Sequence, residues 1–429
     1  MNPRNGHGRH WWGVLLLAWS GIAGASVVAL AGGTVWTGQG PPVLNGVVLL
    51  EAGRVTAVGP LASTPVPAGA EVISTEGMTV LPGLVDLAVH TWRLGHGDPE
   101  RADALLRPLA ARVIAPWVLS SQAAAGVTQG VEFDSPAAGA LALRERLEQR
   151  RLPGPRLAVA GPVLAWQPAG ASLAEARQLL ADGVDVIAVD APEEWPPTEL
   201  RELVDVTRTA GKRVWARLRW GSGLMAALEA GVDGVVGLGL DTAPTWSGES
   251  LAAVRARAAA GRPLHWLPQL APLATRQRWE RDAEALDSPE VFRGLPLLLA
   301  QDLRASWTPY RRALPPPEVA LRAPAAGPRV RALREAGVTV VTGSGAGGPA
   351  LPHALALREE LYALVREAGL SPEQALRAAT VDARAALGLP GILEVGAPAD
   401  LIAVRGPVLE DIGALRDITL VFVAGRRMK

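Results

Sequence analysis

The chain has 429 residues, 49% of them hydrophobic and 20% charged, which suits one large barrel-type domain or two or three ordinary ones. It contains no cysteine, so disulfides, thiolate nucleophiles and Cys-ligated metal centres are excluded. The 42 basic and 42 acidic residues balance, and no segment forms a basic stripe, so the composition does not favour a nucleic-acid partner. Any metal or acid–base site must therefore use carboxylates and six histidines, which are His7, His10, His90, His96, His265 and His353.

Residues 1–25 have the order of a secretory signal peptide. Arg4 and Arg9 precede an uncharged apolar stretch that begins at Trp11, and small residues at Ala23 and Ala25 frame a cleavage site. We expect cleavage and export to the periplasm or the extracellular space. The alternative is an uncleaved membrane anchor, although only about 15 residues remain for the helix, fewer than the roughly 20 that span a bilayer.

Short β runs occupy residues 26–80 and return in residues 386–429. Turn residues separate the runs, and Asn45-Gly46 and Gly53-Arg54 are hairpin signals. We expect these two segments to form one small β-sandwich domain that flanks the rest of the chain.

Residues 81–385 alternate apolar strands with Ala-, Leu- and Arg-rich helices. Several helices end at glycine, as in 174–183, 223–231 and 329–337. Eight such strands joined by helices predict an α/β fold, a (β/α)8 TIM barrel. Residues 275–325 are predicted to be an inserted helical and Pro-rich excursion between the seventh and eighth strands, which either covers the barrel mouth or forms a plain surface loop.

The segment Leu81–His90 (LPGLVDLAVH) resembles the PGLxDxHxH signature of the amidohydrolase superfamily, in its imidazolonepropionase-like and prolidase-like branch. Further segments resemble the same family in the same order along the chain: 151–156, 226–233, 369–380, 396–402 and 421–425. The resemblance implies hydrolysis of C–N bonds by a water bound to one or two divalent metal ions at the barrel mouth.

The resemblance also implies six metal-site positions, and five of them lack the expected group. The family carries two histidines on the first strand, a lysine on the fourth, one histidine each on the fifth and sixth, and an aspartate on the eighth. Here these positions are Ala88, His90, Ala188, Arg217, Gly237 and Gly343. Because a catalytic zinc needs about three protein ligands and a guanidinium repels a cation, we expect no metal and no other cofactor.

Four residues remain candidates for binding. Trp215, Arg217 and Arg219 alternate along the fifth strand and would share one face. We expect Trp215 and Arg217 to fill the space left by the metals, with Asp86 or Glu132 as the carboxylate partner of Arg217. The alternative is an anion-binding pocket formed by His90, Trp215, Arg217 and Arg219.

The other histidines are given structural or solvated roles. His90 is either a relic held by a local hydrogen bond or a ligand-binding group. His96 and His353 lie in Gly- and Pro-rich segments, where we expect solvated side chains near the mouth. His265 starts the seventh strand and is expected to be structural.

Three functions remain open. The first is a non-catalytic subunit or partner of an active amidohydrolase paralogue, or a homo-oligomer, with no membrane contact beyond the signal segment. The second is a protein that binds a small, anionic molecule at the emptied mouth. The third is a metal-independent hydrolase that uses polar groups such as Ser344, Asp86, Glu132 and His90, although no Ser/His/Asp spacing supports it.

Overall fold

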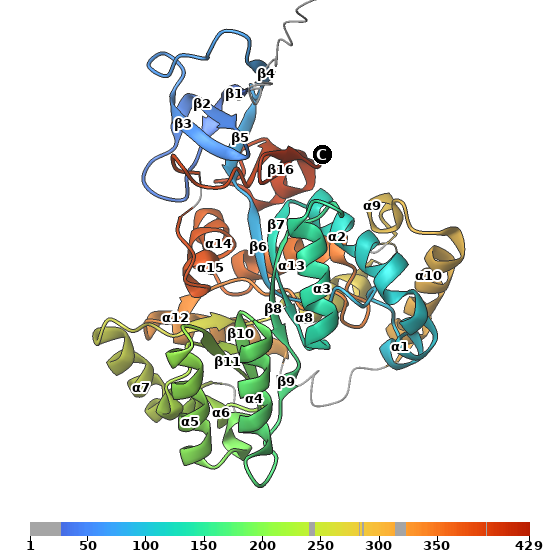
Figure 1. Cartoon of the computed structure of the whole chain (residues 1–429), viewed down its shortest axis with the longest axis vertical. Coiled ribbons are helices and arrows are strands. Elements are labelled where there is room, and N and C mark those ends of the chain that lie inside the picture. The colour runs from blue at the N-terminus through green and yellow to red at the C-terminus, as the bar shows by residue number, and fades with distance from the viewer. Residues whose placement is uncertain (1–26, 240–244, 283, 285–286, 314–322, 392) are drawn as a thin grey trace, which may run out of the picture.

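The computed structural model describes residues 27–239, 245–282, 284, 287–313, 323–391 and 393–429 (Figure 1). The predicted signal peptide, residues 1–25, lies outside the described residues. Among the helices that are described, none combines the length and the apolar character needed to cross a bilayer.

Both ends of the chain contribute to one eight-stranded sheet. Its order is β17-β16-β15-β5-β1-β2-β3, with β4 beside β1. The N-terminal strands are β1 (Val28–Val35), β2 (Val43–Glu51), β3 (Arg54–Pro60), β4 (Glu71–Ser74) and β5 (Met78–Pro82). The C-terminal strands are β15 (Leu401–Arg405), β16 (Ile418–Val423) and β17 (Arg426–Arg427). Strand β5 pairs with β15 across more than 300 residues of sequence, so the middle of the chain is enclosed between two halves of one sheet.

One of the two predicted hairpin turns is wrong. Asn45-Gly46 lies inside β2, where Gly46 pairs with Gly33 of β1 at an irregular register. The connection between β1 and β2 is instead formed by residues 36–42, whereas the turn between β2 and β3 lies at Ala52-Gly53, next to the predicted Gly53-Arg54, and both of its residues have positive φ. Asn45 also has positive φ, so the Asn-Gly signal marks a bulge in the strand rather than its end.

Between these halves, parallel strands form a second layer. Strands β6 (Leu84–Val89), β7 (Val127–Phe133) and β8 (Arg156–Gly161) make one sheet. The other sheet contains β9 (Val163–Leu164), β10 (Val186–Asp190), β11 (Arg213–Arg217), β12 (Gly234–Val236), β13 (His265–Leu267) and β14 (Thr339–Val340). The chain is therefore an α/β protein.

Backbone hydrogen bonds join these two sheets at both edges. Asp185 N donates to Val159 O over 2.7 Å, which links the β8 and β10 segments. At the opposite edge, Leu87 N donates to Thr342 O over 3.0 Å, just beyond β14. The hydrogen-bonded path therefore runs from β6 to β14 and returns to β6.

Helices cross between the parallel strands, and three more, α13, α14 and α15, follow the last of them. They are α2 (Ala115–Ala124), α3 (Ala137–Glu148), α4 (Ala171–Asp182), η3 (Pro192–Glu194), α5 (Pro197–Thr209), α6 (Gly223–Ala230), α7 (Gly248–Ala259), η4 (Ala323–Ala325), α12 (Ala326–Glu335), α13 (His353–Arg366), α14 (Pro372–Ala378), α15 (Val381–Ala386) and, within the terminal sheet, η5 (Ile412–Asp417). Helices α4 and α6 end at Gly183 and Gly231, which adopt the left-handed conformation that residues with a Cβ disfavour.

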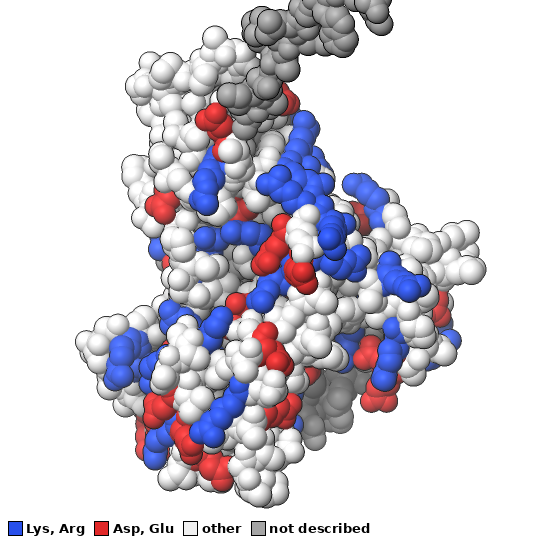
Figure 2. Space-filling model, viewed as in Figure 1, with Lys and Arg blue, Asp and Glu red and all other residues white. Residues whose placement is uncertain are grey.

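Charge is mixed over the helical surface. Figure 2 shows acidic and basic side chains interspersed on the face over α4, α5 and α6. Arg177 on α4 pairs with Glu202 on α5 over 3.1 Å, and both side chains are more than half exposed. Such exposed ion pairs contribute little to the free energy of unfolding.

The predicted excursion lies between β13 and β14 and packs on the segment that follows β6. Its helices are α8 (Ala271–Arg281), which begins four residues before the predicted start, α9 (Pro289–Phe292) and α10 (Leu297–Arg312), and the predicted Pro-rich part at residues 314–322 lies outside the described residues. Opposite it lie α1 (Pro99–Leu106), the 3₁₀ turn η1 (Arg107–Leu109) and the π-helical turn η2 (Ala110–Ile114). Trp307 Nε1 donates to Gly95 O over 2.9 Å, and Trp117 Nε1 donates to Arg293 O over 2.9 Å. The excursion therefore anchors the connection that follows the first parallel strand.

Trp215 is fully buried among the parallel strands. Its neighbours in one apolar cluster include Ala88, Ala188 and Leu267. A Cβ atom at Gly234 would lie 2.9 Å from the indole Cδ1, so the bare glycine on the adjacent strand leaves room for the ring. The indole thus occupies interior space beside two of the positions where the family resemblance implies metal ligands.

Replacing Trp215 by alanine should lower the free energy of unfolding by about 3–5 kcal/mol, because a large cavity would replace a packed ring. Denaturant unfolding followed by circular dichroism measures the change. Trp166→Ala is the matched control, since Trp166 is 38% exposed and should cost less than about 1 kcal/mol. Equal costs at the two positions would contradict the packing role of Trp215.

Candidate functional site

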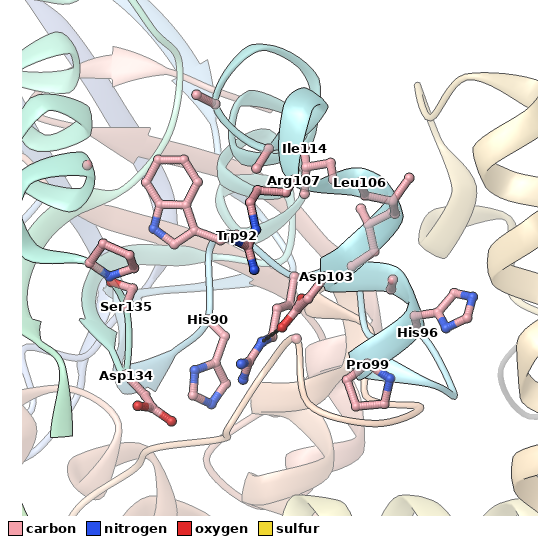
Figure 3. Close-up of a pocket in the computed structure, with 18 of the residues that line it drawn as sticks. His90, Trp92, His96, Pro99, Asp103, Leu106, Arg107, Ile114, Asp134 and Ser135 are labelled. Atoms are coloured by element: carbon pink, nitrogen blue, oxygen red, sulfur yellow. Dashed lines mark hydrogen bonds and ion pairs between the residues drawn. The ribbon is translucent and has the colours of Figure 1, made fainter.

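A cavity of about 560 Å³ lies at the carboxyl ends of β6 and β7. His90 directly follows β6, Glu132 belongs to β7, and Asp134 and Ser135 follow β7. The opposite wall comes from α1, η1 and η2 (Figure 3). Irregular helical turns of the η2 kind are frequent at functional sites, and the volume suits a small organic molecule.

The wall is mainly apolar, and most of its charged groups are paired. Its apolar side chains include Trp92, Leu94, Leu106 and Ile114. Arg93 Nε lies 3.2 Å from Asp103 Oδ2. His96 Nε2 lies 3.3 Å from Asp302 Oδ2, which belongs to α10 of the excursion.

His90 is partly buried and held by the neighbouring strand. Its Nδ1 lies 2.8 Å from Phe133 O, and its own N–H donates to Ala346 O over 2.9 Å. Burial lowers the pKa of His90, and the nearby Arg93 lowers it further. The ring is therefore neutral at physiological pH, with Nδ1–H as the donor to the Phe133 carbonyl.

Arg217 is bound by two carboxylates, Asp190 at the end of the adjacent strand β10 and Asp134 just beyond the end of β7. Its Nε donates to Asp190 Oδ1 over 2.9 Å, and its Nη1 donates to Asp134 Oδ2 over 3.3 Å. The prediction that Asp86 or Glu132 is its partner is wrong, because Asp190 stands opposite Arg217 in the parallel register of β10 and β11.

Arg219 lies beyond the end of β11 and binds the same buried carboxylate. Its Nη2 donates to Asp190 Oδ2, and its Nη1 lies 3.7 Å from Glu194. Burial alone would raise the pKa of Asp190, but the hydrogen bonds from Arg217 and Arg219 outweigh burial and hold that pKa below its ordinary value. We call Asp134, Asp190, Arg217 and Arg219 the Arg–Asp cluster. Two carboxylates already satisfy its guanidinium groups, so the alternative of an anion pocket built on Arg217 and Arg219 gains no support from these contacts.

Asp86 and Glu132 are buried elsewhere. Asp86 accepts hydrogen bonds from the Ser344 hydroxyl and from Ser344 N, the latter over 2.8 Å, and burial raises its pKa to about 6. Glu132 accepts from Thr91 N over 2.8 Å, and burial raises its pKa to about 8. Glu132 is therefore largely protonated at neutral pH.

The expectation of solvated side chains at His96 and His353 is wrong. Both residues are buried, at 3% and 2% exposure. His353 contacts Gln122 Nε2 through Nδ1 and Arg93 O through Nε2, and burial lowers its pKa to about 4. His265 begins β13, with Nδ1 3.3 Å from Asp233 O, at the end of the strands opposite the cavity.

The positions that the family resemblance assigns to metal ligands carry few donor atoms. Ala88 and Ala188 lie in the apolar cluster with Trp215. A Cβ at Gly343 would approach Leu267 Cδ2 to 2.5 Å and Ala88 Cβ to 3.2 Å, so apolar atoms fill the place of a side chain there. Over the described part of the chain, no group of three or more His, Cys, Asp or Glu residues is arranged to hold a metal ion. Alanine and glycine supply no donor atoms, and the guanidinium of Arg217 supplies only a like charge.

The model of the Amidohydrolase family matches residues 79–428, and the chain belongs to this family. An uncharacterized protein of Mycobacterium tuberculosis is 28% identical over 383 residues, which cover 86% of this chain and 90% of that protein. A 5-methylthioadenosine/S-adenosylhomocysteine deaminase of Symbiobacterium thermophilum is 42% identical over 79 residues, only 17% of this chain and 18% of the deaminase. The crystal structure of a Xaa-Pro dipeptidase with bound methionine has a TM-score of 0.73 at 20% identity, covering 94% of this chain and 99% of that one, which shows a shared fold.

Sequence reasoning missed the residues that form the cavity wall opposite the strands. Trp92, Arg107 and Ile114 carry no motif, and they converge because the segment after β6 folds back as α1, η1 and η2. Asp190 could have been found, since the alternation of VDVIAVD places Asp190 on the face of Ala188 and at the carboxyl end of the strand.

Replacing Asp190 by asparagine should cost about 1–3 kcal/mol of unfolding free energy at pH 7, because Arg217 and Arg219 lose their shared carboxylate. The folded-state pKa of Asp190 is lowered, so its contribution is present above the ordinary pKa of 3.8 and is lost as the pH falls below that value. The difference between wild type and variant should therefore shrink below about pH 4, as denaturant titrations at several pH values can show. Asp205→Asn, at an exposed pair with Arg208, is the control, and a pH-independent cost at Asp190 would contradict the ion-pair assignment.

Glu132→Gln should raise the melting temperature by about 5 °C at pH 8–9 and change it little near pH 5. The folded-state pKa of Glu132, about 8, exceeds the ordinary 4.5, so wild type loses stability as the pH rises between these values, and glutamine does not. Differential scanning fluorimetry across this range measures the effect. Glu175→Gln on the exposed surface of α4 serves as the control, and parallel pH profiles for wild type and Glu132→Gln would refute the prediction.

Proposed function

We propose that this member of the amidohydrolase family has lost the metal-dependent hydrolysis of C–N bonds. The observation that carries the proposal is the packing of Trp215 against Ala88 and Ala188, inside the parallel strands. Ala88 and Ala188 stand at two positions that the family resemblance assigns to metal ligands, and apolar side chains surround both.

The Arg–Asp cluster supports the same proposal. Arg217 occupies the fifth-strand ligand position and lies between Asp134 and Asp190. A guanidinium has no lone pair to coordinate a metal and is cationic at any accessible pH. The positive charge that a metal would bring to the strand ends is supplied by the chain itself.

The parallel strands are part of this proposal. We take them to be the (β/α)8 TIM barrel of the superfamily, with the sheet from the two chain ends as its small β-sandwich domain. The path of hydrogen bonds from β6 through β14 back to β6 supports the closed barrel.

The cellular role that fits best is a non-catalytic subunit or partner of an active amidohydrolase paralogue, exported through the N-terminal signal segment. A homo-oligomer is the other assembly that fits. Affinity purification of the tagged chain from its native host, followed by mass spectrometry, tests this role. Recovery of an intact amidohydrolase supports it, and recovery of this chain alone as a monomer contradicts it.

The cavity favours a second function, which is the binding of a small molecule without turnover. Its volume of about 560 Å³ and its mainly apolar wall are typical of such sites. A metal-independent hydrolase is less well supported, because the Ser344 hydroxyl is buried and bonded to Asp86, while His90 contacts Phe133 O.

The purified chain should contain much less than one metal ion per molecule after incubation with Zn²⁺ and desalting. It should not hydrolyse Xaa-Pro dipeptides, which are tested because one similar fold is a Xaa-Pro dipeptidase. Elemental analysis and an amine-release assay measure the two properties. One or two tightly bound ions per chain, with dipeptide turnover that a chelator abolishes, would overturn the proposal.

A further inference from the structure

Arg107 brings an uncompensated positive charge to the cavity. It begins η1, and Figure 3 shows its side chain extending from the helical wall into the space between Trp92 and Asp103. Its guanidinium forms no hydrogen bond or ion pair with any other residue that the structure describes. An arginine left without a carboxylate beside an apolar cavity is suited to an anionic ligand.

The other charges of the wall are already balanced. Arg93 pairs with Asp103, and Asp134 pairs with Arg217 of the Arg–Asp cluster. Glu132 has its pKa raised to about 8 by burial, so it does not oppose an anion at neutral pH. With these groups neutralised, Arg107 determines the net charge that a ligand meets.

Hydrogen-bond donors also line the wall of the cavity. The indole Nε1 of Trp92 is buried without a hydrogen-bond partner in the described part of the chain. The Ser135 hydroxyl and the carboxyl of Glu132, whose pKa is raised to about 8, interact with each other and also line the cavity. All three groups can donate, so they suit a ligand rich in acceptor oxygens.

We infer that this cavity binds an apolar organic anion of the monocarboxylate type. The carboxylate meets Arg107, and the apolar body packs between Trp92, Leu106 and Ile114. The inference rests on the second proposed function, small-molecule binding, and adds the chemical class of the ligand. The predicted alternative was an anion site at Arg217. The site inferred here lies at Arg107, in a segment that carries no family motif.

Three probes of one shape and different charge test the ligand class. Naphthaleneacetate is the anion, naphthaleneethanol the neutral analogue and naphthaleneethylamine the cation, each titrated into the full chain by calorimetry at pH 7. The anion should bind most tightly and the amine most weakly. Arg107→Gln should weaken the anion about tenfold and change the alcohol less than about twofold.

Two further variants separate charge from shape. Arg101→Gln removes an exposed arginine of α1 that does not line the cavity, and it should leave all three affinities unchanged. Ala110→Phe fills the cavity and should abolish binding of all three probes. Circular dichroism and melting temperature confirm that each variant is folded.

The outcomes are distinct. Equal affinities for the three probes, or an anion affinity that Arg107→Gln leaves unchanged, would overturn the anion inference while small-molecule binding stands. Absence of binding by every probe would overturn both the inference and the second proposed function. Neither result bears on the loss of metal-dependent hydrolysis, which the metal and amine-release measurements test separately.

Discussion

The ion pair between Arg217 and Asp190 is the constraint on which the centre of this molecule depends. It joins the ends of β11 and β10, and its reach to Asp134 adds the end of β7. A cation at this place holds together carboxylates that would otherwise repel each other across the strand ends. Because the cation is a side chain, the arrangement is complete as soon as the chain folds, and Trp215, two residues earlier on the same strand, closes the interior beneath it.

Because Trp215 fills the space among the parallel strands, the cavity lies to one side of them. The cavity lies over β6 and β7, and its outer wall is the α1, η1 and η2 segment. That segment has few regular helical turns of its own, and it is supported by the excursion through the bonds of Trp307 to Gly95 and of His96 to Asp302. The excursion therefore acts on the cavity indirectly, by positioning the wall that carries Arg107. This arrangement differs from a lid placed over the strand ends.

Local sequence signals predicted the order of elements well and the contacts of the site poorly. The alternation of apolar strands with helices that end at Gly183 and Gly231 depends on local rules, and so does the LPGLVDLAVH motif that indicates the family. The partner of Arg217 depends on the register between two strands that are 27 residues apart, which composition does not reveal. The burial of His96 and His353 depends on distant segments, α10 and α2, that cover residues whose own Gly- and Pro-rich context is typical of exposed loops.

Buried acids and arginines divide the interior into two electrostatic environments. Burial raises the pKa of Asp86 to about 6, and of Glu132 and Glu360 to about 8. Burial makes protonation the cheaper way to keep Glu132 and Glu360 in apolar surroundings, whereas the two guanidinium groups beside Asp190 hold its pKa below its ordinary value. The interior thus contains one group of carboxylates that arginine compensates and two buried glutamates that protons compensate. This division gives the cavity wall its neutral Glu132 and leaves its net charge to Arg107.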